Sequence, residues 1–233
     1  MHLFYSPDLK DDHYELSPDD SKHCIKVLRL KKGDLVYLTD GKGTLYKARI
    51  IHDDLRSCRV EVIEKQYDYD KRPFSLHIAI APTKNIKRFE WFLEKSTEIG
   101  IDEITPLICF HSERRQLKTE RSNRIITAAI KQSLKTYHPV LNEMIHYNKF
   151  VESGIHGAKF IACCDQGNSK HLKNQYTPGE NATIIIGPEG DFSQQELDKA
   201  NNSGFNPVSL GNSRLRTETA GVVATSIVNL LNE

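Results

Sequence analysis

The chain has 233 residues, of which 38% are hydrophobic and 27% are charged, with 32 Lys and Arg against 31 Asp and Glu. This composition is typical of one or two globular domains and argues against a disordered or fibrous chain. The longest stretches without a charge, such as residues 220–231, are shorter than the ~18–20 residues that cross a bilayer. The first residues lack the order of a secretory signal, so we expect a cytoplasmic protein with no membrane partner.

The net charge of +1 hides an uneven distribution of charge along the chain. Residues 84–135 contain 11 basic and 7 acidic side chains, a net +4, whereas residues 136–233 contain 7 and 10, a net −3. Residues 22–32 contain no acidic side chain and five basic ones: Lys22, Lys26, Arg29, Lys31 and Lys32. Two basic regions indicate either a surface that binds phosphates or simply solvated charge.

Short β-rich runs separated by turns dominate the first part of the chain, at residues 35–39, 44–51 and 58–63. Residues 65–73 show no apolar periodicity and end at a proline, which is typical of a linker. The sequence therefore predicts a small β domain over residues 1–70 and a second domain over residues 73–233.

Strand-like and helix-like segments alternate after the linker. Strands are expected at residues 75–81, 104–109, 159–164, 182–186 and 208–210, and helices at residues 86–99, 121–135, 193–202 and 217–231. This alternation predicts an α/β fold with a mainly parallel sheet. Ligands of such sheets bind at the carboxyl ends of the strands, so the loops that follow strands are the places for a site.

The first unusual loop follows the apolar strand at residues 182–186. It reads Gly-Pro-Glu-Gly at residues 187–190, and Ser193 with Glu196 then forms the pattern of a capping box that begins a helix. Glycines leave the backbone open to a flat ligand, although the same pattern also suits a purely structural corner.

The second unusual loop runs from the last strand into the last helix. Two arginines, a glutamate and two threonines are crowded into residues 209–220 between apolar segments. Burying a charged side chain costs free energy unless the charge is paired or takes part in a binding or catalytic site. These residues are therefore candidates for such a site. The alternative is an ordinary helix start, in which Thr217 is the capping residue and Glu218 interacts with the helix dipole.

Several common sites are excluded by the sequence. It contains no G-x-G-x-x-G, no phosphate-binding P-loop and no G-x-S-x-G elbow. Five cysteines without a C-x-x-C pair, and histidines without H-E-x-x-H spacing, argue against disulfides and a metal. Cys163 and Cys164 end an apolar strand and are expected to be a buried pair rather than nucleophiles.

Five motifs of the chain resemble those of the RsmE family of 16S rRNA uridine N3-methyltransferases. Residues 187–190 and Leu-Arg-Thr-Glu-Thr-Ala at 215–220 resemble the family's cofactor loops. Residues 23–29 are similar to its N-terminal RNA-binding domain, and residues 95–100 and 132–133 match two further signatures. The resemblance covers nearly the whole chain.

The resemblance implies a SPOUT-type α/β domain with a C-terminal trefoil knot, preceded by a small PUA-like β-barrel domain. It also implies S-adenosylmethionine as cofactor, 16S rRNA in the small ribosomal subunit as substrate, a homodimer and no metal. The implied cofactor residues are Ala162, Cys163, Gly187, Pro188, Glu189, Gly190, Leu210, Gly211, Leu215 and Arg216. The basic side chains expected to bind RNA are Lys26, Arg29, Lys84, Arg88, Arg114, Arg115 and Lys135.

Catalysis is expected from Arg216 and Glu218. Arg216 would stabilise negative charge on the uracil ring, and Glu218 would orient it, assist proton removal or act only as an ion-pair partner. The chain departs from the family pattern at three places: Asp191 replaces a glycine, Ser213 replaces an arginine, and Lys135 replaces another arginine. The alternative functions are methylation of a ribose 2′-hydroxyl by another SPOUT enzyme and RNA binding without catalysis.

Overall fold

The computed structural model describes residues 1–163 and 169–233. The chain divides into two compact units, Met1–Lys71 with Ile130–His138, and Arg72–Ala129 with Pro139–Glu233. Cys24, Cys58 and Cys109 are buried free thiols. Cys163 is half-buried rather than fully buried, and Cys164 lies outside the described residues, so its expected burial stays a prediction.

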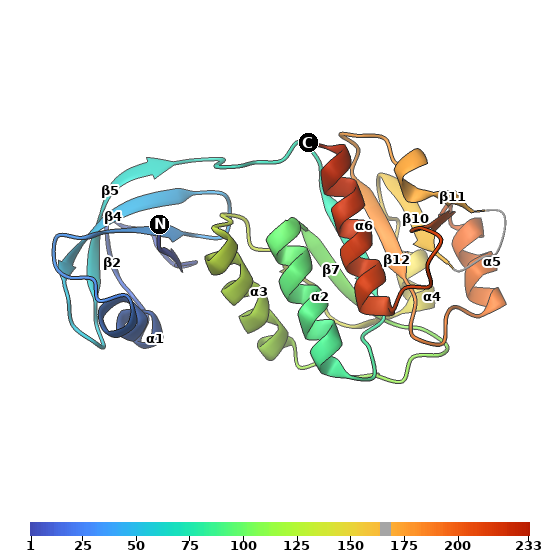
Figure 1. The fold of residues 1–233 in the computed structure, drawn as a ribbon, viewed down its shortest axis with the longest axis horizontal. Coiled ribbons are helices and arrows are strands. Elements are labelled where there is room, and N and C mark those ends of the chain that lie inside the picture. Colours follow the sequence, from blue (N-terminus) through green and yellow to red (C-terminus); the bar gives the residue numbers. More distant parts are fainter. Residues whose placement is uncertain (164–168) are drawn as a thin grey trace. The chain divides into compact units, whose positions relative to one another are not determined.

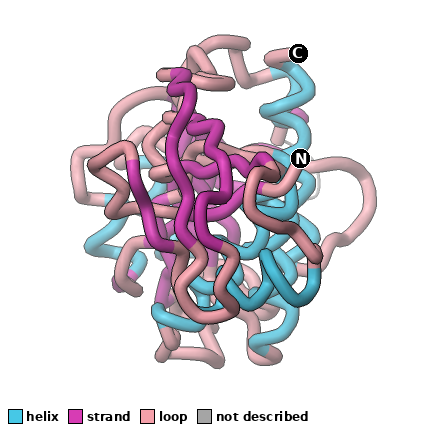
Figure 2. Tube along the Cα trace, turned by 90° about the vertical axis from the view of Figure 1, so that its left-hand side faces the viewer, coloured by secondary structure: helices cyan, strands magenta, loops and turns pink. Residues whose placement is uncertain are grey.

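The first unit contains a five-stranded sheet in the order β1-β3-β4-β5-β2, whose strands appear as neighbouring magenta tubes in Figure 2. The parallel pair is β1 with β3, and the other neighbours are antiparallel. Its elements are β1 (Leu3–Tyr5), β2 (His13–Glu15), α1 (Pro18–Lys22), the π-helical turn η1 (His23–Val27), β3 (Leu35–Thr39), β4 (Leu45–His52) and β5 (Arg59–Gln66).

Alternating side chains explain the core of the first unit. Along β4, Ala48 and Ile50 are fully buried while Arg49 between them is exposed, as expected for a strand with one face on the core. They pack in one cluster with apolar side chains of β3 and β5, among them Leu38 and Val60. The predicted strands at residues 35–39, 44–51 and 58–63 correspond to β3, β4 and β5.

The second unit contains an eight-stranded sheet in the order β11-β13-β10-β12-β6-β7-β8, with β9 also paired to β7, and all of these pairings are parallel. Its strands are β6 (Leu76–Ile80), β7 (Glu103–Ile108), β8 (Val140–Leu141), β9 (Ile145–His146), β10 (Ala158–Ala162), β11 (Lys170–His171), β12 (Ala182–Ile186) and β13 (Asn206–Ser209). Its helices are α2 (Ile86–Ile99), α4 (Tyr147–Val151), η2 (Leu172–Asn174), α5 (Gln194–Asn202) and α6 (Thr217–Leu231), while α3 (Thr119–Ser133) begins here and ends in the first unit.

This sheet is buried on both faces, which explains its continuous apolar strands. Ile78 and Ile184 pack into one cluster with side chains of α2 and α6, which lie side by side in Figure 1. Ala79 and Ile185, the next residues on the same strands, belong to a second cluster with side chains of α4 and α5. Each strand therefore supplies alternate side chains to two separate cores.

A glycine permits the close packing of α6 on α2. A Cβ atom added at Gly221 would lie 2.6 Å from the ring of Phe92 and 3.0 Å from Ile80. Phe92 is fully buried, so its ring has no room to move away. The two helices can approach this closely only because residue 221 has no side chain.

The predicted α/β fold with a parallel sheet is confirmed, and the predicted long elements of the second unit match the observed ones to within two residues. Short elements such as β8, β9 and α4 were not expected, because two to five residues carry too little periodicity. The trefoil knot stays a prediction, since a strand order does not trace how the connections thread. Among the helices of the described residues, none has the length and apolar character needed to span a bilayer.

Candidate cofactor and active site

Three strands of the second unit end side by side. Ala162, the last residue of β10, pairs with Ile186 at the end of β12 and with Val208 near the end of β13. Because the strands are parallel, the segments that follow them leave the sheet at the same edge. The two unusual loops of the sequence therefore begin close together.

A cavity of about 580 Å³ lies at this edge. Its volume is within the range of ~300–1,000 Å³ typical of pockets for small ligands. The described lining combines apolar, polar and charged groups: Ala162, Cys163, Ser169, Asp191, Val208, Ser209, Leu210, Gly211, Asn212, Ser213, Arg214, Leu215 and Ala220. Five of the predicted cofactor residues are among them, namely Ala162, Cys163, Leu210, Gly211 and Leu215.

Gly211 leaves open space at the wall of this cavity. Its φ of +131° is strained for any residue with a side chain, and a Cβ atom added there would meet no atom within 4 Å. Because residue 211 has no side chain, a ligand can approach the backbone of this loop more closely than it could if any other residue stood there. Asn212, Ser213 and Arg214, which follow it, are exposed and bring polar groups to the lining.

The two glycines of the first loop leave space for side chains of the protein itself. A Cβ atom at Gly187 would lie 2.9 Å from the ring of Phe192, and one at Gly190 would lie 2.9 Å from the Cβ of His111. Glu189 accepts a hydrogen bond of 3.0 Å from the backbone N–H of Lys84. The four predicted residues at 187–190 are thus absent from the cavity lining and instead support the segment that leads to it.

Asp191, which follows these four residues, is the part of the first loop that lines the cavity. Its φ of +63° lies in the left-handed region, which glycine adopts freely and which aspartate tolerates better than most residues. The backbone N–H of Phe192 donates to its Oδ1 at 2.8 Å, and its carbonyl oxygen lies 3.0 Å from Nδ1 of His111. This conformation suits the glycine that the resemblance implies at this position, and Asp191 is among the residues that line the cavity.

The predicted capping box at the start of α5 is confirmed. Oε2 of the buried Glu196 accepts from the backbone N–H of Ser193 at 2.9 Å, while its Oε1 accepts from the backbone N–H of Phe110 at 2.8 Å. Glu196 therefore joins the helix start to the segment that follows β7. This second contact has no sequence signal, because it links residues 86 positions apart.

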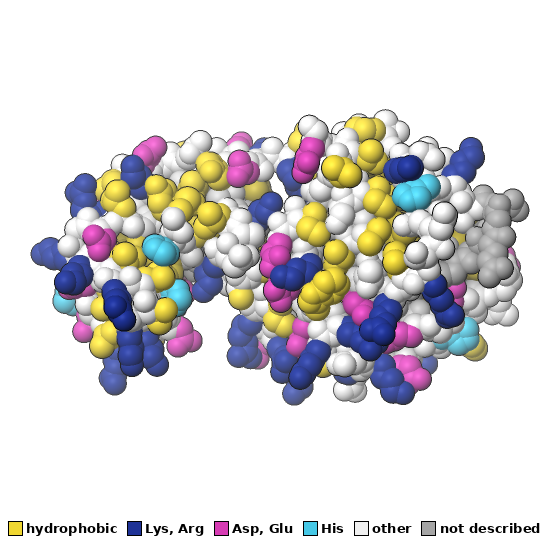
Figure 3. Space-filling model, viewed as in Figure 1, with side chains coloured by type: hydrophobic (Ala, Val, Ile, Leu, Met, Phe, Trp, Pro, Cys, Tyr) yellow, Lys and Arg dark blue, Asp and Glu magenta, His cyan; other side chains and the backbone are white. Residues whose placement is uncertain are grey.

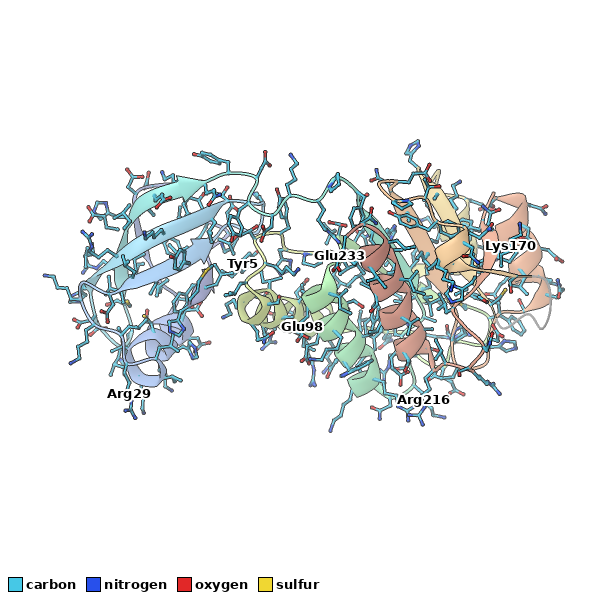
Figure 4. All side chains as sticks on the ribbon, turned by 45° about the horizontal axis from the view of Figure 1, so that its top comes forward. Tyr5, Arg29, Glu98, Lys170, Arg216 and Glu233 are labelled. Atoms are coloured by element: carbon cyan, nitrogen blue, oxygen red, sulfur yellow. The ribbon has the colours of Figure 1, made fainter. Side chains whose placement is uncertain are left out.

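The start of α6 holds the two predicted catalytic residues. Arg216 is the N-cap residue, without a side-chain capping bond, so Thr217 does not cap the helix as the alternative interpretation of this loop required. Thr217 is instead buried in the first turn, with its side chain below the surface. The Arg216 side chain is exposed and has no ion-pair partner among the described residues, and Figure 4 shows it at the N-terminal end of α6.

Glu218 is almost entirely buried and pairs with Arg88. Its Oε1 lies 3.8 Å from Nε of Arg88, and its side chain is 8% exposed against 40% for the arginine. Its buried Oε2 has no hydrogen-bond partner among the described residues. The carboxylate thus contacts an arginine from α2, a long-range partner that the sequence did not identify.

The other predicted RNA-binding side chains belong to both units. In the first unit Lys26 and Arg29 are exposed, and Arg29 has a φ of +58° after η1 and points away from the strands in Figure 4. Figure 3 shows how basic side chains, in dark blue, gather at one end of that unit. Lys135, which is half-buried, also belongs to the first unit.

In the second unit, the basic side chains near the start of α2 are partly engaged within the protein. Arg114 donates to the carbonyl oxygens of Thr83 at 3.0 Å and Lys84 at 2.7 Å. The Lys84 ammonium lies 3.6 Å from the Glu113 carboxylate. Arg115 is exposed. No group of three or more potential metal ligands occurs within the described residues.

Comparison with known proteins decides the family. A family described as RNA methyltransferase domain matches residues 70–229, and one described as RNA methyltransferase PUA domain matches residues 16–63. Ribosomal RNA small subunit methyltransferase E from Synechocystis is 32% identical over 216 residues, which cover 89% of this chain and 70% of the relative. This chain belongs to the ribosomal RNA small subunit methyltransferase E family.

Solved structures of methyltransferases share the fold over nearly the whole chain. A probable rRNA-methyltransferase from Porphyromonas gingivalis is 42% identical with a TM-score of 0.93, covering 100% of this chain and 98% of that one. Ribosomal RNA small subunit methyltransferase E from Neisseria gonorrhoeae, bound to S-adenosyl methionine, is 26% identical with a TM-score of 0.89, covering 100% and 98%. The resemblance to this family, including the N-terminal PUA domain, is confirmed.

Proposed function

We propose that this protein transfers a methyl group from S-adenosylmethionine to N3 of a uridine in 16S rRNA of the small ribosomal subunit. The observation that carries the proposal is the cavity at the carboxyl ends of β10 and β13, lined by the loop at residues 209–215. The family relatives are named for the small-subunit rRNA, and the Neisseria relative binds S-adenosyl methionine.

The cavity offers groups that fit this cofactor. S-adenosylmethionine, when bound, supplies a methyl group that is already activated for transfer. The molecule carries both positive and negative groups, and the cavity offers the Asp191 carboxylate and the Arg214 guanidinium as charged partners. Apolar side chains such as Leu210 and Leu215 offer contact surface, and the open backbone at Gly211 offers peptide hydrogen bonds.

The remaining predicted cofactor residues act in this proposal as supports. Gly187 and Gly190 allow Phe192 and His111 to pack against the loop, and Glu189 fixes the backbone of Lys84. The short segment from Gly187 through Pro188 to Gly190 therefore holds Asp191 at the wall of the cavity. Arg216 follows the lining residue Leu215 directly and extends the site toward the substrate.

Arg216 is the proposed catalytic cation. Its exposed guanidinium has no ion-pair partner in the described part of the chain, so its charge is available to the uracil ring. Loss of the N3 proton leaves negative charge on the ring, which a positioned cation stabilises. A guanidinium offers N–H donors and no acceptor, so Arg216 acts here by charge and hydrogen bonding.

The two carboxylate oxygens of Glu218 suit two different roles. Its unpartnered buried Oε2 suits a proton acceptor, whereas the contact of Oε1 with Arg88 suits a positioning residue that holds an RNA-binding arginine. The glutamine variant keeps the shape and removes the charge. Retained RNA affinity with a lost transfer rate would support the first role, and lost affinity with a normal rate at saturating RNA would support the second.

The proposed RNA contacts are made by basic side chains that each unit supplies by itself: Lys26, Arg29 and Lys135 in the first unit, and Lys84, Arg88, Arg114 and Arg115 in the second. Contacts of such groups with phosphates position an RNA without reading its sequence. We also propose that the enzyme acts as a homodimer in the cytoplasm, where its rRNA substrate is found. Sedimentation at low and high protein concentration tests the dimer.

The deciding experiment is methylation of small ribosomal subunits from cells that lack this activity, followed by mapping of the modified base. A methyl on uridine N3 supports the proposal, and a methyl on a ribose or no incorporation contradicts it. Arg216→Ala should lower the single-turnover rate by ~100-fold or more, as for other charge-stabilising groups, while the thermal shift caused by S-adenosylmethionine persists. A near-normal rate would remove Arg216 from the mechanism.

A further inference from the structure

A second cavity, of about 690 Å³, lies between α2 and α3 in the second unit. It is lined by Lys87, Glu90, Trp91, Glu94, Arg121, Arg124, Ile125 and Ala128, and we call it the Trp91 groove. None of these residues lines the proposed cofactor cavity. Trp91 is the single tryptophan of the chain, and it is 41% exposed.

The position of Trp91 on its helix shows that it is not a core residue. Phe89, Phe92 and Leu93 of α2 are fully buried, and they face the sheet. Lys87 and Trp91 lie four residues apart on another face of the helix, with Glu94 three residues further on. The indole therefore adds a large aromatic surface to the groove without contributing to the main hydrophobic core.

Salt bridges neutralise the acidic side chains of the groove. Nε and Nη2 of Arg121 donate to Oε1 and Oε2 of Glu90, at 2.6 and 2.9 Å, and this pair joins α3 to α2, neighbouring helices in Figure 1. Glu94 receives a hydrogen bond of 2.8 Å from the Lys95 ammonium. Both carboxylates of the groove are thus compensated by cations within this unit.

Two cations of the groove keep their charge available. Lys87 has no ion-pair partner among the described residues. The guanidinium of Arg124 lies 3.9 Å from Glu120, and both side chains are largely exposed, so water and salt screen this contact. The groove thus combines a flat aromatic surface with an available cation on each of the two helices.

We propose that Trp91 stacks on an unpaired base of the RNA substrate, and that Lys87 and Arg124 contact the phosphates beside that base. A flat base with a charged backbone matches both features, because proteins hold single-stranded nucleic acid with aromatic platforms and flanking cations. The proposal rests on the proposed function in taking RNA as the substrate. Lys84 and Arg88, two of the proposed RNA-binding residues, are within three positions of Lys87 in the sequence, near the start of α2.

The single tryptophan makes the groove directly observable. Emission of Trp91 in the full chain is recorded while a short single-stranded oligoadenylate is added, and again with an oligomer of equal length that lacks all bases. Stacking predicts that oligoadenylate quenches the emission strongly and that the abasic oligomer leaves it nearly unchanged. Equal quenching by the two oligomers, or none by either, overturns the proposal.

Variants separate stacking from charge. Trp91→Ala should weaken binding of oligoadenylate, measured by anisotropy of a labelled strand, by on the order of ten-fold, and Trp91→Phe should recover part of that loss. Lys87→Ala should lower the affinity for both oligomers and reduce the salt dependence of binding. Unchanged affinity in Trp91→Ala, with the variant shown to be folded by circular dichroism, contradicts the proposal.

Two controls separate base stacking from self-association and from loss of cofactor binding. A blue shift of Trp91 emission that grows with protein concentration in the absence of RNA would show that a protein surface covers the groove, and this result also overturns the proposal. The thermal shift caused by S-adenosylmethionine should be equal in wild type and Trp91→Ala. Loss of that shift in the wild-type protein would contradict the proposed function, whereas loss of quenching alone contradicts only the role of the Trp91 groove.

Discussion

The contact between Arg88 and Glu218 leads to an asymmetric prediction for stability. Glu218 is buried and Arg88 is partly exposed, with 3.8 Å between Oε1 and Nε. Arg88→Ala leaves the carboxylate buried without its cation, whereas Glu218→Gln leaves a guanidinium that water can reach. The arginine variant should therefore be much less stable than the glutamine variant, although each removes the same ion pair.

The geometry sets the size of this difference. Two unit charges 3.8 Å apart interact by about 4 kcal/mol at an effective dielectric constant of 20, and this is an upper bound because Arg88 is partly solvated. We expect Arg88→Ala to lower the free energy of unfolding by about 2 kcal/mol. Glu218→Gln loses mainly the favourable position of a charge in the first turn of α6, ~0.3–1 kcal/mol.

Urea unfolding of the full chain provides the assay, because Trp91 emission reports on the second unit. In the double variant the buried charge is absent, so adding Glu218→Gln to Arg88→Ala should restore most of the lost stability. Two results would contradict this prediction: a loss from Glu218→Gln alone as large as that from Arg88→Ala, or a double variant in which the two losses add. Either would show that Arg88→Ala does not leave an unpaired buried carboxylate.

Three other residues give further predictions. Asp191 has a φ of +63°, so Asp191→Ala should lower the free energy of unfolding by ~1 kcal/mol, whereas Asp191→Gly should stay near wild type. Urea unfolding measures both, and an equal loss of stability in the two variants would contradict this prediction. Gly211→Leu should abolish the thermal shift caused by S-adenosylmethionine, because the side chain would enter open space at the cavity wall, and a normal shift would place the cofactor elsewhere. Burial lowers the pKa of His77 below its usual value of ~6.5, although Glu103 opposes this shift. As the pH falls below ~6.5, His77 is therefore protonated in the unfolded chain before it is protonated in the folded protein. The contribution of neutral His77 to the free energy of unfolding is present above that pH and is lost below it. His77→Gln should flatten the pH dependence of the urea midpoint below pH ~6.5, and an unchanged slope would exclude His77 as its source.

Local sequence patterns predicted most of the fold because they depend on neighbouring residues. The apolar run of β12 requires burial on both faces, and the capping box of Ser193 and Glu196 lies within four consecutive residues. The loop at residues 209–220 was expected at the sheet edge, and five predicted cofactor residues line the cavity there. Such features can be read from the chain without knowing what packs against it.

Long-range contacts decided the rest. The sequence alone determined an α/β domain after a small β domain, two candidate loops and, through its motifs, a family. Only the tertiary structure showed that Gly187 and Gly190 make room for Phe192 and His111, that Glu218 contacts Arg88, and that Trp91 lies in an open groove. These contacts depend on which strands and helices become neighbours in space, and packing of the whole sheet determines that, because no local pattern specifies a partner far along the chain.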